Sequence, residues 1–245
     1  MQKEFIEPNF NPLISVIIPV FNGEKFIKNL LEHLNTQQYT NFEVIVIDDG
    51  STDNTAKIIQ NFSHINYNYQ ENAGPAAARN HGLKLAMGEF IAFIDSDDLW
   101  PETHLTSLIE HFKNNHELSI VEGLIQELTL NNKQFEAKAP PHFNCTLGSC
   151  IIRKSTFETI GFFDEELIYC EDVDWFTRAW ENNVLKKRIS TISLYYRRHE
   201  NNMTLDLTSR YRYRMLFYKK KIAREKSMVN QPTVTRPFPL KDYLN

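Results

Sequence analysis

The stretch Phe90-Ile91-Ala92-Phe93-Ile94-Asp95-Ser96-Asp97-Asp98-Leu99-Trp100 places three carboxylates directly after five apolar residues. The apolar residues have the length and residue types of a buried strand, and the carboxylates begin where that strand should end. Carboxylates this close together repel one another and cost stability unless a cation lies among them. Oxygen ligands suit Mg²⁺ or Mn²⁺, so the stretch predicts a metal site or, alternatively, a solvated acidic turn.

Upstream of this stretch, apolar runs alternate with amphipathic segments. The expected strands cover residues 13–20, 42–47 and 65–69, and the expected helices cover residues 24–36, 53–62 and 75–87. Strands that are apolar throughout and separated by helices indicate a parallel sheet that is covered on both faces. We therefore predict an α/β fold with a mainly parallel central sheet, helices on both of its faces and a smaller region after it.

Polar or turn residues follow three of the expected strands, at residues 19–22, 48–51 and 95–98. In an open α/β sheet, ligands bind beyond the carboxyl ends of the strands. Polar residues at successive strand ends should therefore face one crevice. This convergence favours a ligand site over unrelated acidic turns.

After Pro101, apolar runs and amphipathic segments alternate less regularly. We expect helices at 102–115, 154–160 and 173–181, strands at 145–153 and 184–196, mixed strand and loop at 118–130, and a loop over the site at 131–144. These segments form the smaller region of the predicted fold.

The net charge of −4 hides a split along the chain. From Ser209 onward there are ten Lys and Arg against two Asp and Glu, so this tail carries +8 and the rest of the chain −12. An acidic body argues against a nucleic-acid groove. The tail, 209–245, is basic and aromatic, which fits either an amphipathic helix on an anionic membrane or a helix packed on the acidic body. Residues 231–245 contain three prolines, and we expect them to be flexible.

Several other classes of protein lack support in the sequence. No apolar stretch approaches the roughly 18 residues that a membrane-spanning helix needs. Residues 1–12 are polar and include acids, unlike a secretory signal. The three cysteines, Cys145, Cys150 and Cys170, have no zinc-type spacing and are expected to be reduced thiols of a cytoplasmic protein.

Four segments in a fixed order resemble a known family: residues 15–22, 46–53, 95–98 and the pair Glu171-Asp172. Together they resemble glycosyltransferase family 2, inverting enzymes with the Rossmann-like GT-A fold, over about residues 13–205. The resemblance implies transfer of a sugar from a nucleotide-diphosphate sugar, UDP being favoured, with Mn²⁺ or Mg²⁺ as cofactor. The acceptor would be a hydroxyl of a glycan, a lipid-linked sugar or another molecule.

The resemblance also implies a set of residues that contact the nucleotide sugar: Pro19, Phe21, Asn22, Asp49, Arg79, Asp95, Ser96 and Gly148. Asp49 would accept a hydrogen bond from N3–H of uracil, although a carboxylate there could equally cap a turn. Arg79 would offset diphosphate charge or orient the acids, or be an ordinary surface arginine. Gly148 would let the donor sugar approach closely.

For the metal, the resemblance implies Asp97, Asp95 and His199 as ligands. For the chemistry it implies the pair Glu171 and Asp172, with Asp172 taking the proton from the acceptor hydroxyl. The alternative is an acid pair that stabilises the start of a helix, and both roles can hold together.

We expect a domain at 1–208, with a nucleotide-binding half at about 13–100 and an acceptor and catalytic half at about 101–208. The tail at 209–245 is expected to be partly flexible, with possible peripheral contact to the inner face of a membrane. Two other functions remain open. A sugar nucleotidyltransferase would need an early phosphate loop rich in glycine and lysine, and residues 21–25 match one poorly. A non-catalytic binding module would not need both Asp97 and Asp172.

Overall fold

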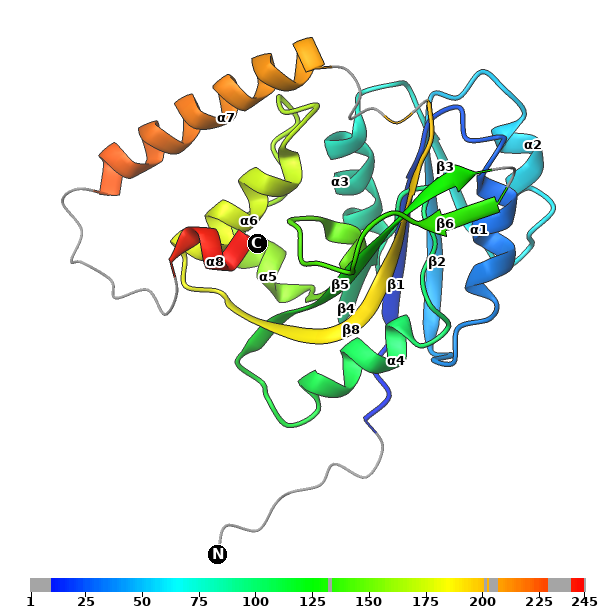
Figure 1. The fold of residues 1–245 in the computed structure, drawn as a ribbon, viewed down its shortest axis with the longest axis horizontal. Coiled ribbons are helices and arrows are strands. Elements are labelled where there is room, and N and C mark those ends of the chain that lie inside the picture. The colour runs from blue at the N-terminus through cyan, green and yellow to red at the C-terminus, as the bar shows by residue number, and fades with distance from the viewer. Residues whose placement is uncertain (1–9, 132–133, 201, 203–206, 229–238, 245) are drawn as a thin grey trace, which may run out of the picture.

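The computed structural model of the chain describes residues 10–131, 134–200, 202, 207–228 and 239–244. Its eight strands form one sheet, in the order β3-β2-β1-β4-β7-β5-β6, with β8 paired to β5 (Figure 1). The first four strands run parallel to one another: β1 (Ile14–Val20), β2 (Phe42–Asp49), β3 (Asn66–Gln70) and β4 (Phe90–Phe93). This half matches the parallel sheet predicted from the continuous apolar runs.

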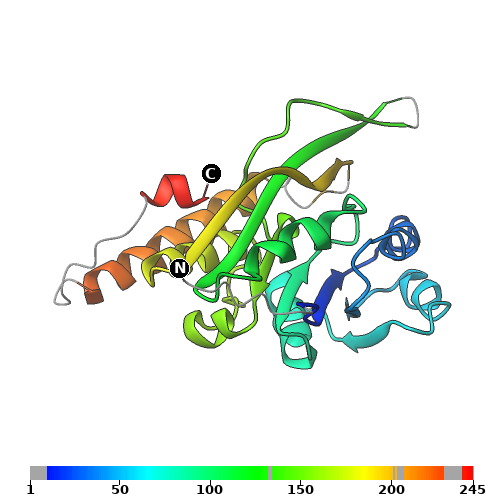
Figure 2. The ribbon, with the colours of Figure 1, turned by 90° about the horizontal axis from the view of Figure 1, so that it is seen from below.

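The second half of the sheet is mixed. Its strands are β5 (Leu118–Asn131), β6 (Gln134–Ala137), β7 (Cys150–Arg153) and β8 (Leu185–Arg198). Strand β7 runs antiparallel to both β4 and β5, whereas β8 runs parallel to β5. The hairpin of β5 and β6 projects from the body of the molecule (Figure 2). The sheet as a whole remains mainly parallel, as expected.

Helices cover both faces of the sheet. One face packs against α1 (Ile27–Leu34), α2 (Thr55–Ile59) and α4 (His104–Ile109), and the other against α3 (Pro75–Leu85), α5 (Ser155–Ile160) and α6 (Glu171–Glu181). Successive side chains of a strand point to opposite faces, so Val16 of β1 joins the first cluster and Ile17 joins the second. Gly82 of α3 lies against Ile17, where an added Cβ would come within 2.4 Å of a side-chain carbon. The missing side chain thus lets α3 pack closely on β1.

The structure corrects some of the expected elements. Residues 131–144 are not all loop, because β6 pairs with the end of β5. This strand escapes sequence reasoning because its residues are mostly exposed and have no apolar alternation. Residues 118–130 belong to a single strand, and residues 145–153 form a strand only from Cys150, after the short 3₁₀ helix η2 (Leu147–Ser149). A second 3₁₀ turn, η1 (Glu110–Phe112), ends the helix expected at 102–115.

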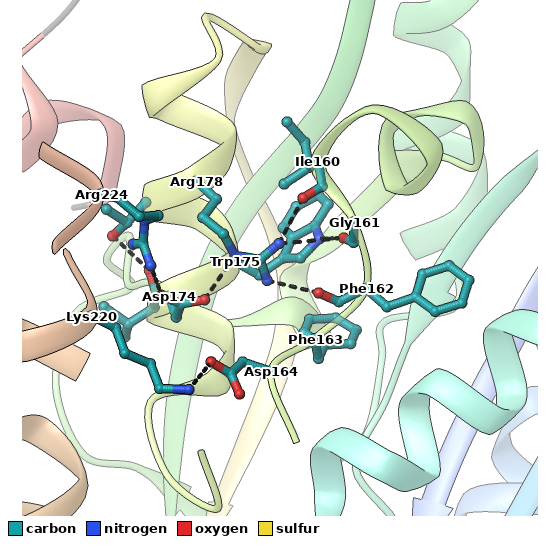
Figure 3. Close-up of polar contacts among 12 residues, drawn as sticks. Ile160, Gly161, Phe162, Phe163, Asp164, Asp174, Trp175, Arg178, Lys220 and Arg224 are labelled. Atoms are coloured by element: carbon teal, nitrogen blue, oxygen red, sulfur yellow. Dashed lines mark hydrogen bonds and ion pairs between the residues drawn. The ribbon is translucent and has the colours of Figure 1, made fainter. Parts of the chain in front are cut away.

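The tail forms two helices, α7 (Leu207–Met228) and α8 (Leu240–Leu244). Helix α7 lies along α6, and Arg224 and Lys220 of α7 make ion pairs with acids of the body (Figures 1 and 3). The alternative that the tail packs on the acidic body is therefore confirmed.

The flexibility expected of residues 231–245 is wrong at α8. The Tyr243 side chain is buried, and its hydroxyl donates a hydrogen bond of 3.1 Å to the carbonyl oxygen of Val184. Residues 231–238 and 245 lie outside the described part of the chain, so the expectation is not tested there. In the described ranges, no helix has both the length and the apolar character needed to cross a membrane.

Candidate active site

A cavity of about 1460 Å³ opens beyond the carboxyl ends of β1, β2 and β4. It is lined by every residue that the sequence assigned to a site: Pro19, Phe21, Asn22, Asp49, Arg79, Asp95, Ser96, Asp97, Gly148, Glu171, Asp172 and His199. The crevice expected at the strand ends is present. The lining shows where these residues lie, and the role of each stays a prediction.

The ends of β1 and β2 are tied together by Asn22. Its backbone N–H donates to Oγ of Ser51 at 2.8 Å, and its side-chain oxygen accepts from the N–H of Thr52 at 2.8 Å. Asn22 has a positive φ of 51°, a conformation in which asparagine is enriched. These bonds hold Phe21, which is half exposed, at the mouth of the cavity.

Asp49 at the end of β2 has the capping role that the sequence left open. Its Oδ1 accepts hydrogen bonds from Gln70 and from the N–H of Ala73, and its Oδ2 accepts from the N–H of Gly74 at 2.8 Å. These bonds fix the turn that leads into α3. Because carboxylate oxygens each accept about two hydrogen bonds, Oδ2 keeps capacity for one more donor.

Arg79 of α3 is buried and joins two acids of the cavity. Its Nη1 lies 2.6 Å from Oε1 of Glu171, and its Nη2 lies 2.8 Å from Oδ1 of Asp95. Burial alone disfavours the charged guanidinium, but Asp95, Glu171 and Asp172 together raise the pKa of Arg79 above its ordinary value. The alternative of an ordinary surface arginine is therefore wrong.

Glu171 and Asp172 begin α6, in the order expected for a helix that starts with an acid pair. Burial raises the pKa of Glu171 to about 7, Arg79 opposes this effect and Asp172 adds to it. Burial also raises the pKa of Asp172, again opposed by Arg79. Oδ1 of Asp172 accepts the N–H of Val173 at 2.7 Å, while Arg79 holds Glu171. Both acids line the cavity, but Glu171 is buried and held by an ion pair, whereas Asp172 is half-buried.

Asp97 and His199 meet on one side of the cavity. Nε2 of His199 lies 2.8 Å from Oδ2 of Asp97, and the imidazole ring stacks on Phe26 with centroids 4.5 Å apart. Asn202 completes this cluster: its Oδ1 accepts the N–H of His199 at 2.6 Å, and its Nδ2 lies 3.2 Å from Oδ2 of Asp97. No role for Asn202 is predicted from the sequence, although its position three residues after His199 is a usable signal.

Taken alone, the His, Cys, Asp and Glu side chains of the described ranges form no group of three that could hold a metal ion. Asp95 is engaged by Arg79, so a ligand set of Asp95, Asp97 and His199 is not assembled. Asp97 and His199 nevertheless fit a divalent cation. A carboxylate oxygen and an imidazole nitrogen suit Mn²⁺, and such ions commonly take further oxygens from a bound phosphate and water.

Asp98 does not share the cavity with its neighbours. It is 3% exposed, and its Oδ1 accepts the backbone N–H of Arg197 at 2.9 Å. The guanidinium of Arg197 donates to the backbone carbonyl oxygens of Asp97 and Asp98. The acidic stretch is therefore balanced in part by Arg197 and Arg79, two cations of the chain itself. The expectation that a bound cation must offset all three carboxylates was too simple.

Gly148 lines the cavity, but packing explains why this residue is a glycine. An added Cβ would lie 3.1 Å from the Leu194 side chain of β8, and the carbonyl oxygen of Gly148 accepts a hydrogen bond from Nε1 of Trp100. Contact of the Gly148 backbone with a donor stays a prediction.

A second ion pair in the cavity was not found from the sequence. Arg198 of β8 makes two hydrogen bonds, of 2.8 and 2.7 Å, to the carboxylate of Glu127 on β5. Both residues line the cavity on the side of the hairpin. The pair depends on the register of β5 with β8, which no local sequence pattern reveals.

Comparison with known proteins identifies the family. Residues 15–163 match the family model "Glycosyl transferase family 2". An uncharacterized glycosyltransferase of Rickettsia typhi is 30% identical over 189 residues, covering 68% of this chain and 58% of that protein. The chain therefore belongs to glycosyl transferase family 2. This finding confirms the family that the sequence predicted.

Solved structures agree in fold. TarS of S. aureus in complex with UDP-GlcNAc is 25% identical, with a TM-score of 0.67 over 94% of this chain and 69% of that chain. The mannosyltransferase PcManGT of Pyrobaculum calidifontis, in complex with GDP-Man and Mn²⁺, has the same TM-score at 17% identity and covers 97% of this chain and 69% of that chain. The fold is GT-A, as expected.

The matches cover parts of longer proteins. The chain spans 58% of the length of the Rickettsia typhi relative and 34% of the length of the glycosyltransferase GlyG of Streptococcus pneumoniae. A putative teichuronic acid biosynthesis glycosyltransferase of Bacillus subtilis, TuaG, is 38% identical over 108 residues, covering 42% of each chain.

Proposed function

We propose that the chain is an inverting glycosyltransferase that moves a sugar from a nucleotide-diphosphate sugar, preferably a UDP-sugar, to an acceptor hydroxyl in one displacement. One observation carries the proposal. The half-buried carboxylate of Asp172 lines the same cavity as the Asp97–His199 pair and the nucleotide-side Asp49. A base, a pair of metal-binding groups and a candidate base-recognition group thus surround one space large enough for a nucleotide sugar.

Asp172 is the proposed general base. Its raised pKa favours proton acceptance near neutral pH, because a catalytic base works best when its pKa lies close to the working pH. Glu171 would hold Arg79 in place and keep the start of α6 against the cavity. Asp172 would then take the acceptor proton as the acceptor oxygen attacks the anomeric carbon.

Asp97 and His199 would hold Mn²⁺ or Mg²⁺, and Asn202 would orient both. The bound ion would stabilise the negative charge on the diphosphate that leaves. Arg79, which is itself buried, would supply fixed positive charge behind the acids.

The preference for UDP rests on Asp49. Its Oδ2 accepts one backbone hydrogen bond and has room for another, which N3–H of uracil could donate. The TarS structures that resemble this chain at 25% identity contain UDP and UDP-GlcNAc, and this agrees with the preference. Binding can be compared by thermal shift with UDP-, GDP- and dTDP-sugars, with and without Mn²⁺.

The acceptor and the organisation of the chain follow as proposals. Residues 13–100 would form the nucleotide-binding half and residues 101–208 the acceptor and catalytic half. Residues 209–245 would form the basic, aromatic tail, whose helices α7 and α8 pack on the body. The similarity to TuaG, a putative teichuronic acid biosynthesis glycosyltransferase, favours an acceptor in polysaccharide or glycoconjugate synthesis. A cytoplasmic location rests on the three free thiols alone.

The substitution Asp172→Asn tests the chemistry. It keeps the shape of the side chain but removes the proton acceptor, so sugar transfer should fall by about 10² to 10⁴. Binding of UDP-GlcNAc with Mn²⁺, measured by calorimetry on the same preparation, should survive. Asp242→Asn, at an exposed position of α8, is the matched control and should leave both quantities unchanged.

Two results would contradict the assignment. Transfer at the wild-type rate would move the base to another group, and a parallel loss of donor affinity would make Asp172 a binding residue. The stereochemistry has its own test: NMR of the product should show the anomeric configuration opposite to that of the donor. A protein that binds UDP-sugars but never transfers or hydrolyses them would be the binding module instead. Release of diphosphate from a nucleoside triphosphate and a sugar phosphate would identify a nucleotidyltransferase.

A further inference from the structure

Helix α7 has two apolar faces. The inner face packs on the body through the buried Phe217 and through Tyr213, whose ring lies 5.6 Å from that of Tyr169. The outer face carries four large apolar side chains that are 42–68% exposed: Tyr211, Met215, Tyr218 and Ile222. Their spacing of four, three and four residues places them in one row along the helix, which we call the outer stripe.

Basic residues flank the outer stripe on both sides. Arg212, Lys219 and Lys226 are exposed and recur every seven residues, so they form one row. Arg210, Arg214 and Lys221 form a second row on the other side of the stripe. Glu225, the single acid between residues 207 and 228, makes an ion pair with Lys221 of the second row. The outer surface of α7 is thus an apolar row between two cationic rows.

We propose that the outer stripe docks the chain onto an anionic membrane surface. The four side chains would enter the boundary between headgroups and acyl chains, and the basic rows would contact lipid phosphates. Two of the four are tyrosines, whose amphipathic rings are enriched at this depth of a bilayer. Long lysine and arginine side chains can reach the headgroups while their stems cover apolar surface.

Charge favours a lipid surface over a second copy of the chain. A two-fold dimer through the outer stripe would place the same surface on both copies and bring like-charged rows together. A lipid surface offers apolar chains and negative charge side by side, which is the arrangement that the helix presents. An anionic lipid surface is therefore the partner that the outer stripe fits.

The docked helix would lie next to the cavity. Arg210 in the first turns of α7 lines the cavity, as does Tyr169, the residue that Tyr213 contacts. A membrane bound along the outer stripe would therefore run beside the mouth of the candidate active site. The docking itself requires no glycosyl transfer, so it can be tested whether or not the proposed function holds.

Vesicle co-sedimentation of the full chain tests the proposal. The wild-type chain should sediment with vesicles of phosphatidylcholine and phosphatidylglycerol but weakly with phosphatidylcholine alone, and added salt should reduce binding. The double variant Met215→Glu/Ile222→Glu should bind at least about tenfold more weakly, because two apolar side chains no longer enter the membrane. Met87→Glu places the same charge at another exposed methionine, 74% exposed between α3 and β4, and should bind like the wild type.

A second variant tests the charge while leaving the stripe intact. Lys219→Gln/Lys226→Gln removes two exposed cations and should weaken binding to anionic vesicles by about tenfold or more. Thermal unfolding of each variant shows whether it is folded. The proposal is overturned if the folded wild-type chain ignores anionic vesicles, or if Met87→Glu loses as much binding as the stripe variant. A dimer in sedimentation velocity that Met215→Glu/Ile222→Glu abolishes, without lipid binding, would identify a second copy as the occupant.

Discussion

Nη1 of Arg79 on α3 donates a hydrogen bond of 2.6 Å to Oε1 of Glu171 on α6, across 92 residues of sequence. The same guanidinium reaches Asp95, directly after β4, at 2.8 Å. One buried cation therefore connects a helix, a strand end and the start of the helix that carries Asp172. The residue before Asp172 is thus tied to α3 and to the end of β4.

Replacing Arg79 with Gln should destabilise the fold. The change leaves Glu171 buried without its cation, and breaking a buried pair in this way costs about 3–5 kcal/mol. The free energy of unfolding in urea measures the loss. Lys28→Gln breaks the pair with Glu32 on the exposed side of α1 and should cost less than about 0.5 kcal/mol. Equal effects of the two variants would mean that the Arg79 pair is as weak as a surface pair.

The raised pKa of Glu171, about 7, predicts a specific dependence of stability on pH. The ordinary value is 4.5, so between the two values the folded state holds a proton that the unfolded state has released. The stabilisation from this group is therefore complete below the ordinary value and disappears as the pH rises to about 7. Glu171→Gln lacks this contribution.

Unfolding curves at several pH values compare the two proteins. The stability of the wild type should fall relative to that of Glu171→Gln between about pH 5 and pH 7, by at most about 1.4 kcal/mol per pH unit. Above that range the difference should level off. A difference that does not change with pH would show that Glu171 titrates like an ordinary carboxyl group.

The sequence predicts those parts of the site that lie at strand ends. Asp49, Asp95 and Asp97 each follow an apolar run, and the geometry of a parallel sheet brings such ends to one edge. The sequence does not predict the partners that charges find across the fold. Asp98 resembles its neighbours in the sequence, yet it is buried against Arg197, 99 residues away.

The tail likewise has features that the sequence predicts and contacts that it does not. Its basic and aromatic composition predicted a helix and two possible surfaces for it. The choice of surface depended on where the acids of the body lie in space, and the structure assigns the inner face to the body. Local patterns such as helical periodicity can be read from the chain, whereas contacts between distant segments cannot.

Substitutions of Asp97 and His199 test the proposed metal pair. Asp97→Asn keeps the size of the side chain but removes the charge that a divalent cation needs. Mn²⁺-dependent binding of UDP should weaken by at least about tenfold, or 1.4 kcal/mol, in calorimetry. Burial raises the pKa of Asp97, so the neutral amide should not cost the fold stability. His199→Ala should have a smaller effect, because the carboxylate of Asp97 remains.

The control for this pair is Asp172→Asn, which removes a carboxylate from the same cavity but not from the proposed metal pair. Its affinity for UDP with Mn²⁺ should match that of the wild type. If Asp97→Asn binds UDP equally well with Mn²⁺ and with a chelator present, the assignment of the metal to Asp97 and His199 is wrong.

Arg224 joins α7 to two buried acids of α6. Its Nη1 lies 2.9 Å from Oδ1 of Asp174 and its Nε lies 2.8 Å from Oε2 of Glu181, and the side chains of both acids are at most 2% exposed (Figure 3). Asp174 also pairs with Arg178 at 2.8 Å, so it keeps a cation when Arg224 is removed. Glu181 already has one buried oxygen without a hydrogen-bond partner, so it depends more heavily on Arg224.

The attachments of α7 should therefore differ in strength in a fixed order. Arg224→Gln leaves Glu181 buried without its cation. The free energy of unfolding should fall by about 3 kcal/mol, because the unpaired acid cannot reach water. Lys220→Gln breaks pairs with the more exposed Asp164 and Glu166 and should cost about 1 kcal/mol or less. Lys226→Gln, on the outer face, should change stability by less than about 0.5 kcal/mol. Urea unfolding ranks the three variants, and limited proteolysis reports whether α7 leaves the body.

The order of the three variants matters because α6 carries both Asp174 and Asp172. If cleavage within α7 is fastest in Arg224→Gln, the tail is held through the helix that bears the proposed base. If the three variants are equally stable, the inner apolar face around Phe217 holds α7, and the ion pairs only accompany it.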